Sequence, residues 1–482
     1  MGDLLNNPAV QGGLAPFAVA LVVTFALFAV RLGGLAIAAA LGTAVYMIGG
    51  FAFPPVSAQQ KILLVALAVP ALGIVVDLAF KPTRVAGPVL GLLFGVVVLW
   101  VGVNVLKQKE MPAILLAGGG VFALVAWLVG AMFALRDDPA RAGAAALTLG
   151  LGVGVSAVLS ASGSYGQYGA SVGAGAGAFL LVQMLLGRTI LAGATFTLSA
   201  GVAAGLIAAG AVLGAQLPWY AAASLALVPV ATLLPLPKSG VWLQAIAASV
   251  YGGIPALAAC LLSWPEVQQR LGLRFPFEDP DPQLRNEKMR KLAVAALFSL
   301  PLAAFASPEN YTIDPNHTFL YWEVEHLGVS MQRGRFERTS GKFTLDHAAK
   351  SGSVDLSVET ASLSSGDNVK GSRPRTLDDH MRTADFFNVA EFPRMTFKST
   401  GVKFAGDNPV EIAGTLTLLG VTKPLTLKID RWVCKDNPMS KKPMCGGNAS
   451  GTVKRTEFGM KYGVPAVGDD IRLWVTMEGY KD

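Results

Sequence analysis

The residues best suited to acid–base chemistry in this sequence surround one histidine. His380 lies close in the chain to Asp378, Asp379 and Asp385, and an imidazole beside a carboxylate is a common general-base pair. No Ser or Cys sits in a strained turn of the Gly-x-Ser-x-Gly type that would supply a nucleophile. The other histidine–acid pair, Glu325–His326, is on a predicted strand, where adjacent side chains point to opposite faces. We therefore predict a protein that is not an enzyme.

Metal chemistry is not favoured either. A zinc site needs at least three convergent ligands, whereas His317, His326 and His380 are dispersed along the chain. All four histidines follow residue 306, so the earlier part has none that could ligate haem or copper. Cys434 and Cys445 have ten residues between them and no nearby histidine. We expect them to form a disulfide if this region lies outside the cytoplasm.

Composition divides the chain near residue 306. Overall the 482 residues are 52% hydrophobic and 15% charged, which is too apolar for a soluble protein and too charged for a purely membrane one. Residues 1–306 hold 16 Lys and Arg and 10 Asp and Glu, whereas residues 307–482 hold 23 and 22. The excess positive charge therefore lies mainly beside apolar runs in the first part, as membrane topology requires. It does not indicate a nucleic-acid partner.

The first 264 residues predict a polytopic helical membrane domain. We count about ten runs of roughly 17 or more apolar residues, each long enough to cross a bilayer. They cover residues 14–30, 32–53, 62–80, 85–106, 112–135, 143–161, 168–186, 190–213, 219–234 and 241–264.

Few ionisable groups interrupt these runs. Asp77 is the one acid within a run, and because Lys81 and Arg84 follow it we predict an interface residue paired with those cations. Ten spans place the basic stretch 270–291 opposite to the loop that contains Arg136. Either one span is miscounted or the positive-inside rule fails here.

Two further segments precede the polar part. Residues 265–288 are polar and Pro-rich, which is typical of a linker. Residues 289–306 begin with Met-Arg-Lys, continue with an apolar core of about 15 residues, and end in Ala304-Phe-Ala306, which together are typical of a secretory signal peptide. The segment predicts either a final span of a true fusion or the start of a separate secreted protein. Cleavage after Ala306 fits both alternatives.

Residues 307–482 change to a hydrophobic period of two. Apolar and polar residues alternate over 353–359, 410–418, 425–430 and 471–478, and further strands fit 318–326, 335–346, 394–403 and 450–455. About eight antiparallel strands can close into a barrel that holds one small ligand. Residues 376–388 lack alternation and begin with Thr376, a residue suited to helix capping, so they predict a short helix at the barrel mouth.

Several motifs of this region carry a family resemblance. They are Tyr311-Thr-Ile-Asp-Pro-Asn-His317, Val324-Glu-His-Leu-Gly328, Asp379-His-Met-Arg382 with Asp385-Phe-Phe387, Phe392-Pro393, the stretch 414–424 and Arg455-Thr-Glu-Phe-Gly-Met460. In this order they resemble the YceI-like family of periplasmic polyisoprenoid-binding proteins. The resemblance covers residues 307–482 and does not extend to residues 1–288.

The resemblance implies a lipocalin-like antiparallel barrel in a bacterial periplasm, with an isoprenoid chain, either a quinone tail or a polyprenyl phosphate, in an apolar pore. The segment Cys434–Cys445 also resembles a cysteine-containing hairpin that is present in part of that family. Candidate lipid-contacting residues are mostly aromatic residues and methionines, which would suit either a tunnel wall or a solid core. They are Phe319, Trp322, Phe336, His380, Arg382, Phe386, Phe387, Met395, Phe397, Phe458 and Met460.

The sequence thus predicts an inner-membrane helical bundle followed by an all-β, lipocalin-like barrel of about eight strands with a short helix. The barrel would bind or carry a polyisoprenoid lipid in the periplasm, without a further cofactor, and near the lipid head group we expect His380 or Arg382. One alternative is a sensory or structural barrel attached to a membrane transporter. A lipid-modifying enzyme that uses His380 as its base is the weaker alternative.

Overall fold

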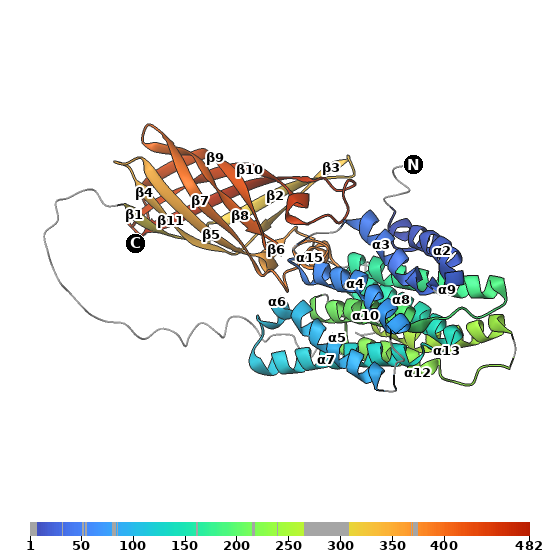
Figure 1. Cartoon of the computed structure of the whole chain (residues 1–482). Helices are drawn as coiled ribbons and strands as arrows, with labels where there is room; N and C mark the ends of the chain where they lie inside the picture. Colours follow the sequence, from blue (N-terminus) through green and yellow to red (C-terminus); the bar gives the residue numbers. More distant parts are fainter. Residues whose placement is uncertain are drawn as a thin grey trace.

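The computed structural model describes residues 7–264 and 308–482, apart from residues 31, 51–52, 54, 80–82, 84, 161, 215–216, 239, 368 and 370–374. Within these ranges the chain forms a helical bundle and a β-barrel that rests on one end of it (Figure 1). The proposed linker, residues 265–288, and the signal-like segment, residues 289–306, lie outside the described residues.

Ten apolar helical segments build the bundle, one for each predicted run. They are α2 (Ala15–Leu27), α3 (Ala36–Ile48), α4 (Ala58–Ala79), α5 (Ala86–Val101), α7 (Met111–Ala134), α8 (Pro139–Ser160), α9 (Gly163–Leu186), α10 (Gly193–Gly214), the pair α11 (Trp219–Ala226) and α12 (Val228–Ala231), and α13 (Val241–Leu262). By length and composition, seven of the described helices are long and apolar enough to cross a membrane, and three apolar segments are shorter.

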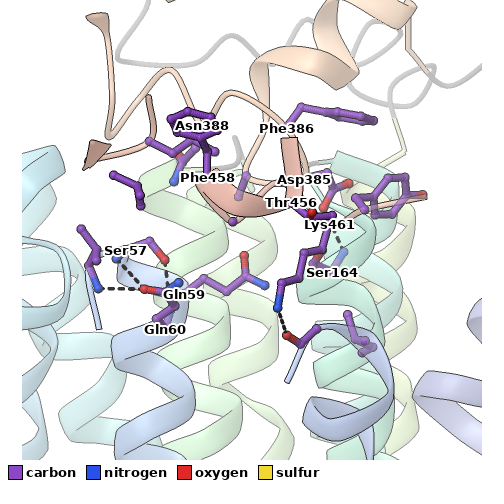
Figure 2. A pocket seen from close by; sticks show the side chains of 18 of the residues that line it. Ser57, Gln59, Gln60, Ser164, Asp385, Phe386, Asn388, Thr456, Phe458 and Lys461 are labelled. Atoms are coloured by element: carbon purple, nitrogen blue, oxygen red, sulfur yellow. Dashed lines mark hydrogen bonds between the residues drawn. The ribbon is translucent and has the colours of Figure 1, made fainter. Parts of the chain in front are cut away.

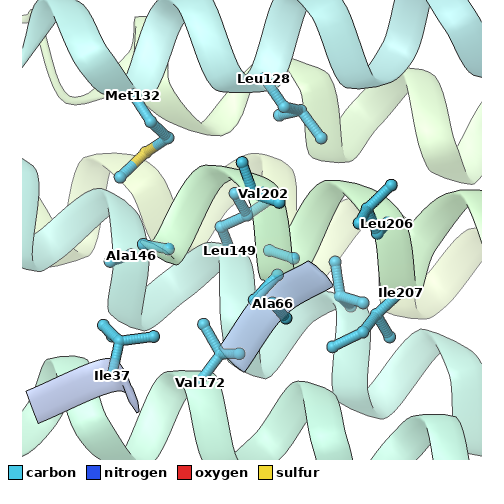
Figure 3. Close-up of a cluster of buried hydrophobic side chains, with 14 of the residues drawn as sticks. Ile37, Ala66, Leu128, Met132, Ala146, Leu149, Val172, Val202, Leu206 and Ile207 are labelled. Atoms are coloured by element: carbon cyan, nitrogen blue, oxygen red, sulfur yellow. The ribbon is translucent and has the colours of Figure 1, made fainter. Parts of the chain in front are cut away.

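Helix α10 forms the centre of the bundle. Its residues from Gly193 to Ala211 are all buried, and Val202, Leu206 and Ile207 lie among side chains of the surrounding helices (Figure 3). Small residues let the outer helices approach one another: a Cβ added at Gly150 would lie 2.4 Å from the backbone nitrogen of Gly173. Backbone contact of this kind is typical of membrane helix pairs, because packing must replace the hydrophobic effect inside a bilayer.

Asp77 has a structural role at the start of α10. Its carboxylate accepts hydrogen bonds from the backbone nitrogens of Ala194 and Thr195 at 2.7 and 2.8 Å, and from the Thr195 hydroxyl at 2.7 Å. It therefore caps the start of α10, where backbone N–H groups lack partners within the helix. The predicted partners Lys81 and Arg84 lie outside the described residues.

Helix direction defines two faces of the bundle. Helices α4 and α9 begin, and α3 and α8 end, at the face that contacts the barrel, which we call the barrel face. Helix α13 runs parallel to α8, since the Cys260 sulfur lies 3.8 Å from the Ser156 hydroxyl near the ends of both helices. The chain thus leaves the bundle at Trp264 on the barrel face, as an even number of antiparallel helical segments requires.

The barrel is a closed antiparallel meander. Each of its first three strands is interrupted and consists of two pieces. These pieces are β1 (Glu309–Ile313) and β2 (Phe319–His326), β3 (Ser330–Phe336) and β4 (Thr339–Asp346), and β5 (Ser351–Glu359) and β6 (Leu363–Ser364). The remaining five are β7 (Arg394–Ala405), β8 (Asn408–Leu418), β9 (Val421–Asp436), β10 (Pro443–Lys454) and β11 (Asp470–Lys481). Pairing of β11 with β1 and β2 closes the ring of eight strands, which confirms the predicted fold.

A short helix lies where the barrel meets the bundle. Helix α15 (Leu377–Arg382) begins after Thr376, whose hydroxyl accepts a hydrogen bond from the backbone nitrogen of Asp379 at 3.0 Å. The capping prediction is therefore confirmed, but the helix ends six residues earlier than expected. Beyond Arg382 the chain forms the turns that carry Asp385 and Glu391 to the bundle.

Candidate functional site

The barrel interior contains an apolar cavity at its bundle end. This cavity has a volume of about 90 Å³ and receives side chains from β2, β3, β7, β8, β10, β11 and the α15 region. The alternation of each strand creates it, because every second residue points inward. On β2, for example, Leu320, Trp322 and Val324 line the cavity.

A smaller apolar cavity lies further along the barrel. It measures about 20 Å³, and its wall includes Phe397, Ile412 and Trp432. Most of the side chains around both cavities belong to one hydrophobic cluster. The barrel interior is thus apolar at both cavities and packed for most of its length.

Six of the candidate lipid-contacting residues line the larger cavity and one lines the smaller. Those in the larger cavity are Trp322, Phe336, Phe386, Phe387, Met395 and Met460. Phe397 lines the smaller cavity. Phe458 is 2% exposed and lines a third cavity, between barrel and bundle.

Phe319 is on the outer face of the barrel instead. It lies three positions from Trp322 on the same strand, so alternation puts the two side chains on opposite faces. The Arg335 guanidinium lies 4.9 Å from the Phe319 ring centre, in a cation–π contact. The structure therefore corrects the expectation that Phe319 contacts a ligand in the pore.

His380 and Arg382 are both engaged with the protein. The Nε2 atom of His380 lies 2.8 Å from the Asp385 carboxylate, and the ring packs against Phe386 and Tyr462. Arg382 donates to the backbone carbonyls of Leu363 at 2.8 Å and Ala361 at 3.2 Å. Neither side chain lines the larger barrel cavity.

Asp385 connects the barrel to the start of α9. Its carboxylate is buried and accepts hydrogen bonds from the Ser162 hydroxyl at 2.6 Å and from the backbone nitrogens of Gly163 and Ser164 at 2.9 and 3.1 Å. Burial acts to raise the pKa of Asp385. The hydrogen bond and charge of His380, and the hydrogen bonds from Ser162 and Ser164, outweigh burial and hold this pKa below its ordinary value. The carboxylate is therefore ionised at neutral pH.

The order of these three groups does not suit nucleophilic catalysis. In a catalytic triad the histidine lies between the hydroxyl and the carboxylate, so that it can take the hydroxyl proton. Here the Asp385 carboxylate lies between Ser162 and His380, and Ser162 donates to the acid. The arrangement fixes two parts of the chain to each other and does not activate the serine.

Glu391 makes a second connection of the same kind. Its carboxylate accepts from the backbone nitrogen of Ala58 at 3.0 Å, at the start of α4, and from the Asn104 side chain at 3.0 Å. Burial raises the pKa of Glu391, while the hydrogen bonds from Ala58 and Asn104 and the charge of Lys61 oppose the rise. Helix α4 also carries its own capping box, in which Ser57 and Gln60 bond each other's backbone nitrogens.

A larger cavity, the interdomain chamber, lies between barrel and bundle (Figure 2). It has a volume of about 300 Å³ and a mixed polar and apolar wall. The bundle contributes Ser57, Gln59 and Ser164, and the barrel contributes Phe386 and Lys461. In Figure 2 the polar side chains of α4 face upward toward the turns of the barrel that carry Asp385 and Asn388.

One group of described residues has the geometry to approach a metal ion. Ligand atoms of Asp314, His317 and Glu478 lie within 4.8 Å of one another near the end of the barrel. Asp314 is already bonded to the backbone nitrogen of Asn316 and to the His317 ring, as in an ordinary turn. His317 is exposed, so this cluster has the features of a solvated turn.

Sequence reasoning missed the interdomain chamber and both carboxylate connections. The Ser57-x-x-Gln60 capping box was a visible signal that a helix starts at this point. No local signal shows that Asp385 and Glu391 cap helices whose first residues lie more than 200 positions away in the chain.

The second part of the chain is similar to known proteins. Residues 311–479 match the model of the YceI-like domain. A UPF0312 protein of Pseudomonas aeruginosa is 36% identical over 195 residues, which is 40% of this chain and 98% of that protein. Protein YceI of Salmonella arizonae is 34% identical over 186 residues, covering 39% of this chain and 93% of the relative.

The chain also has matches among solved structures. Burkholderia cenocepacia BcnA matches with 21% identity and a TM-score of 0.29, covering 34% of this chain and 98% of BcnA. A polyisoprenoid binding domain from Saccharophagus degradans matches with 17% identity and a TM-score of 0.27, covering 36% and 98%.

Proposed function

The chain belongs to the YceI-like family through residues 311–479, and on this basis we propose that its barrel binds a polyisoprenoid lipid. The observation that carries the proposal is the cavity of about 90 Å³, which has a predominantly apolar wall. An isoprenoid tail offers only apolar surface, so such a wall suits it. Each buried CH₂ group contributes roughly 0.8 kcal/mol to binding.

The tail enters by displacing side chains of the barrel interior. The cavity is smaller than most small-molecule sites, which measure roughly 300–1,000 Å³. Three methionines, Met381, Met395 and Met460, belong to its wall. Methionine is unbranched and adopts several rotamers at low cost, so these side chains can move aside for a chain-like ligand.

Binding, storage or transfer of the lipid is the activity that we propose, without a chemical step. The Ser162–Asp385–His380 order supports this, because it leaves the histidine without a hydroxyl to activate. Asp378, another candidate partner of His380, accepts instead from the backbone nitrogen and hydroxyl of Ser365 at 2.8 and 2.6 Å.

The barrel face of the bundle is proposed to be periplasmic. In the sequence, the segments between α2 and α3, α4 and α5, α7 and α8, α9 and α10, and α12 and α13 contain Arg31, Lys81, Arg84, Arg136, Arg188 and Lys238, whereas the segment between α5 and α7 contains Lys107 and Lys109. Short cytoplasmic loops are enriched in Lys and Arg. The loops between helices therefore support a cytoplasmic opposite face and a barrel that is held at the outer surface of the inner membrane. The basic stretch 270–291, which follows α13 in the sequence, departs from the rule.

A second candidate function is a sensory or structural barrel on a membrane protein of other activity. The carboxylate connections through Asp385 and Glu391 favour it, since they hold the barrel against the bundle. The two functions differ in whether lipid occupies the barrel.

The deciding experiment is native mass spectrometry and organic extraction of the full chain, purified from membranes in mild detergent. We expect a co-purified isoprenoid lipid. Leu416→Trp fills the cavity and should remove it, whereas Thr415→Trp, on the outer face of the same strand, should retain it. A thermal melt of each variant checks folding. A folded wild-type chain without isoprenoid, even after incubation with one, would support the accessory function.

A further inference from the structure

The interdomain chamber is a partly polar cavity next to the barrel interior. Its wall combines helix starts in the bundle with the turns at the barrel mouth. At about 300 Å³ it reaches the lower limit of small-molecule sites, roughly 300–1,000 Å³. A single ring or a short polar group fits a space of this size, and a long chain does not.

Phe386 belongs to the walls of both the chamber and the larger barrel cavity. Its ring packs against His380 and Tyr462, with ring centres 5.1 and 5.5 Å away. An apolar cavity and a polar chamber therefore meet at one aromatic side chain. A lipid with an apolar tail and a polar head has the same two-part form.

The chamber offers little to a phosphate group. Helix N-termini are common phosphate sites because their free N–H groups and dipole favour an anion. Two helices start beside the chamber, and protein carboxylates already cap both: Asp385 at α9 and Glu391 at α4. A phosphate at the start of α9 would meet the negative charge of Asp385, which lines the chamber.

The cations around the chamber are also engaged. Lys461 donates to the backbone carbonyl of Gly49. The guanidinium of Arg455 donates to four backbone carbonyls, among them Tyr462 at 2.8 Å and Gly468 at 2.8 Å. Arg375 lies 4.0 Å from the Asp385 carboxylate. Phosphate recognition ordinarily uses clustered arginines in bidentate contact.

The wall also contains uncharged hydrogen-bonding groups. The Gln59 amide, which is hydrogen-bonded to the Tyr168 hydroxyl, and the Ser164 hydroxyl both belong to the chamber lining. Figure 2 shows the Gln59 side chain extending between the bundle and the barrel turns. An amide can donate to a carbonyl oxygen or accept from a hydroxyl, and neither contact requires a charge on the ligand.

We propose that the chamber holds the uncharged, oxygen-bearing head group of an isoprenoid, such as a quinone-type ring or a prenyl alcohol. The tail passes Phe386 into the barrel, and Gln59 bonds the head group. The proposal rests on the lipid-binding function above and narrows its ligand to unphosphorylated isoprenoids. It also gives the bundle a direct part in ligand recognition.

Four probes with the same fifteen-carbon skeleton test the proposal: farnesane, farnesol, farnesyl monophosphate and a farnesyl-substituted benzoquinone. The full chain in detergent is incubated with equal concentrations of all four, and native mass spectrometry measures the occupancy by each. We expect the quinone and the alcohol to exceed the phosphate by about ten-fold or more, the effect of losing one or two good polar contacts.

Gln59→Leu should lower quinone occupancy by about five-fold, as expected for one lost hydrogen bond, and leave farnesane unchanged. Gln332→Leu, an exposed position on β3, is the matched control and should bind like wild type. Phosphate occupancy equal to that of the quinone, or a quinone occupancy insensitive to Gln59→Leu, overturns the head-group site while lipid binding stands. If the folded chain binds none of the probes, the lipid-binding function itself fails.

Discussion

The Ser162 hydroxyl, at the start of α9 in the bundle, donates a hydrogen bond of 2.6 Å to the buried Asp385 carboxylate of the barrel domain. Together with the backbone nitrogens of Gly163 and Ser164, it surrounds the carboxylate with donors from a helix N-terminus. Such charge-assisted bonds are among the stronger ones in proteins. The two parts of the chain are therefore held by specific chemistry as well as by covalent connection.

Replacement of Asp385 by Asn should weaken this attachment. The amide keeps the size of the side chain but loses the charge, and hydrogen bonds to charged groups contribute about 1.5–3 kcal/mol each. A protease site inserted between Ala306 and Ser307, after the apolar segment 289–306, permits cleavage, after which the barrel remaining with washed membranes is measured. Wild-type barrel should stay bound, and Asp385→Asn combined with Glu391→Gln should release it.

Asp379→Asn is the control for that assay. Asp379 lies on α15 and its side chain pairs with Arg382 at 3.4 Å, away from the start of α9. It should leave the barrel attached. Equal release from the double variant and the wild type would show that other contacts hold the two domains together.

Acidification should affect the two carboxylates in opposite directions. Burial acts to raise the pKa of Asp385, while His380, Ser162 and Ser164 lower it below 3.8; His380 belongs to the barrel itself, so the part of the lowering that depends on attachment comes from Ser162 and Ser164 of the bundle. The contribution of Asp385 to attachment is therefore complete above pH 3.8 and is lost as pH falls further. Burial raises the pKa of Glu391 above 4.5, although the charge of Lys61 opposes the rise. Between pH 4.5 and this raised pKa, the Glu391 carboxyl is therefore more protonated in the attached state than in the detached state.

The same release assay, run from pH 7 to pH 3, measures both effects. Attachment of the wild type should strengthen as pH falls toward 4.5 and weaken below about 3.8. Glu391→Gln should remove the first change and Asp385→Asn the second. A wild-type profile that weakens steadily from pH 7 would contradict the assignment for Glu391.

The sequence predicted the barrel well because its structure is locally determined. Alternation along β8 and β11 has a period of two, and a strand must present one face inward to bury those residues. Thr376 likewise signals a helix start within three residues of its partner, Asp379. The ten helices followed from apolar runs whose length the bilayer sets.

The attachment of barrel to bundle could not be predicted in this way. Asp385 and Glu391 look like ordinary acids of a surface turn, since their partners belong to helices far earlier in the chain. The error at Phe319 had a different origin. The alternation was visible, but Phe319 was selected for its aromatic character, although Trp322 on the same strand already pointed inward.

Truncation of Phe386 should speed lipid exchange. Removing the ring joins the barrel cavity to the interdomain chamber, because Phe386 lines both. Stopped-flow release of a fluorescent isoprenoid from the full chain should become several-fold faster in Phe386→Ala. Phe319→Ala removes an outer-face ring and should release at the wild-type rate. A slower release from Phe386→Ala would show that this residue does not obstruct the path.

The disulfide between Cys434 and Cys445 should stabilise the far part of the β9–β10 hairpin. Closing a short loop limits the unfolded chain and contributes about 2–4 kcal/mol. Replacing both cysteines by serine should lower the melting temperature of the barrel, while Cys260→Ser should change it little. Alkylation of the denatured wild type should label one thiol before reduction and three after it. Three labelled thiols without reduction would show that the bond is absent.

Cysteine labelling can test which side of the membrane the barrel occupies. In a Cys260→Ser background, Asp137→Cys places a thiol on the opposite face and Asp407→Cys places one in an exposed turn of the barrel. The ten helices put these positions on different sides of the bundle. A membrane-impermeant maleimide added to spheroplasts should label Asp407→Cys at once and Asp137→Cys only after lysis, because the loops rich in Lys and Arg are expected inside. The reverse pattern would place the barrel in the cytoplasm, whereas labelling of both without lysis would mean that the helices do not span the membrane as proposed.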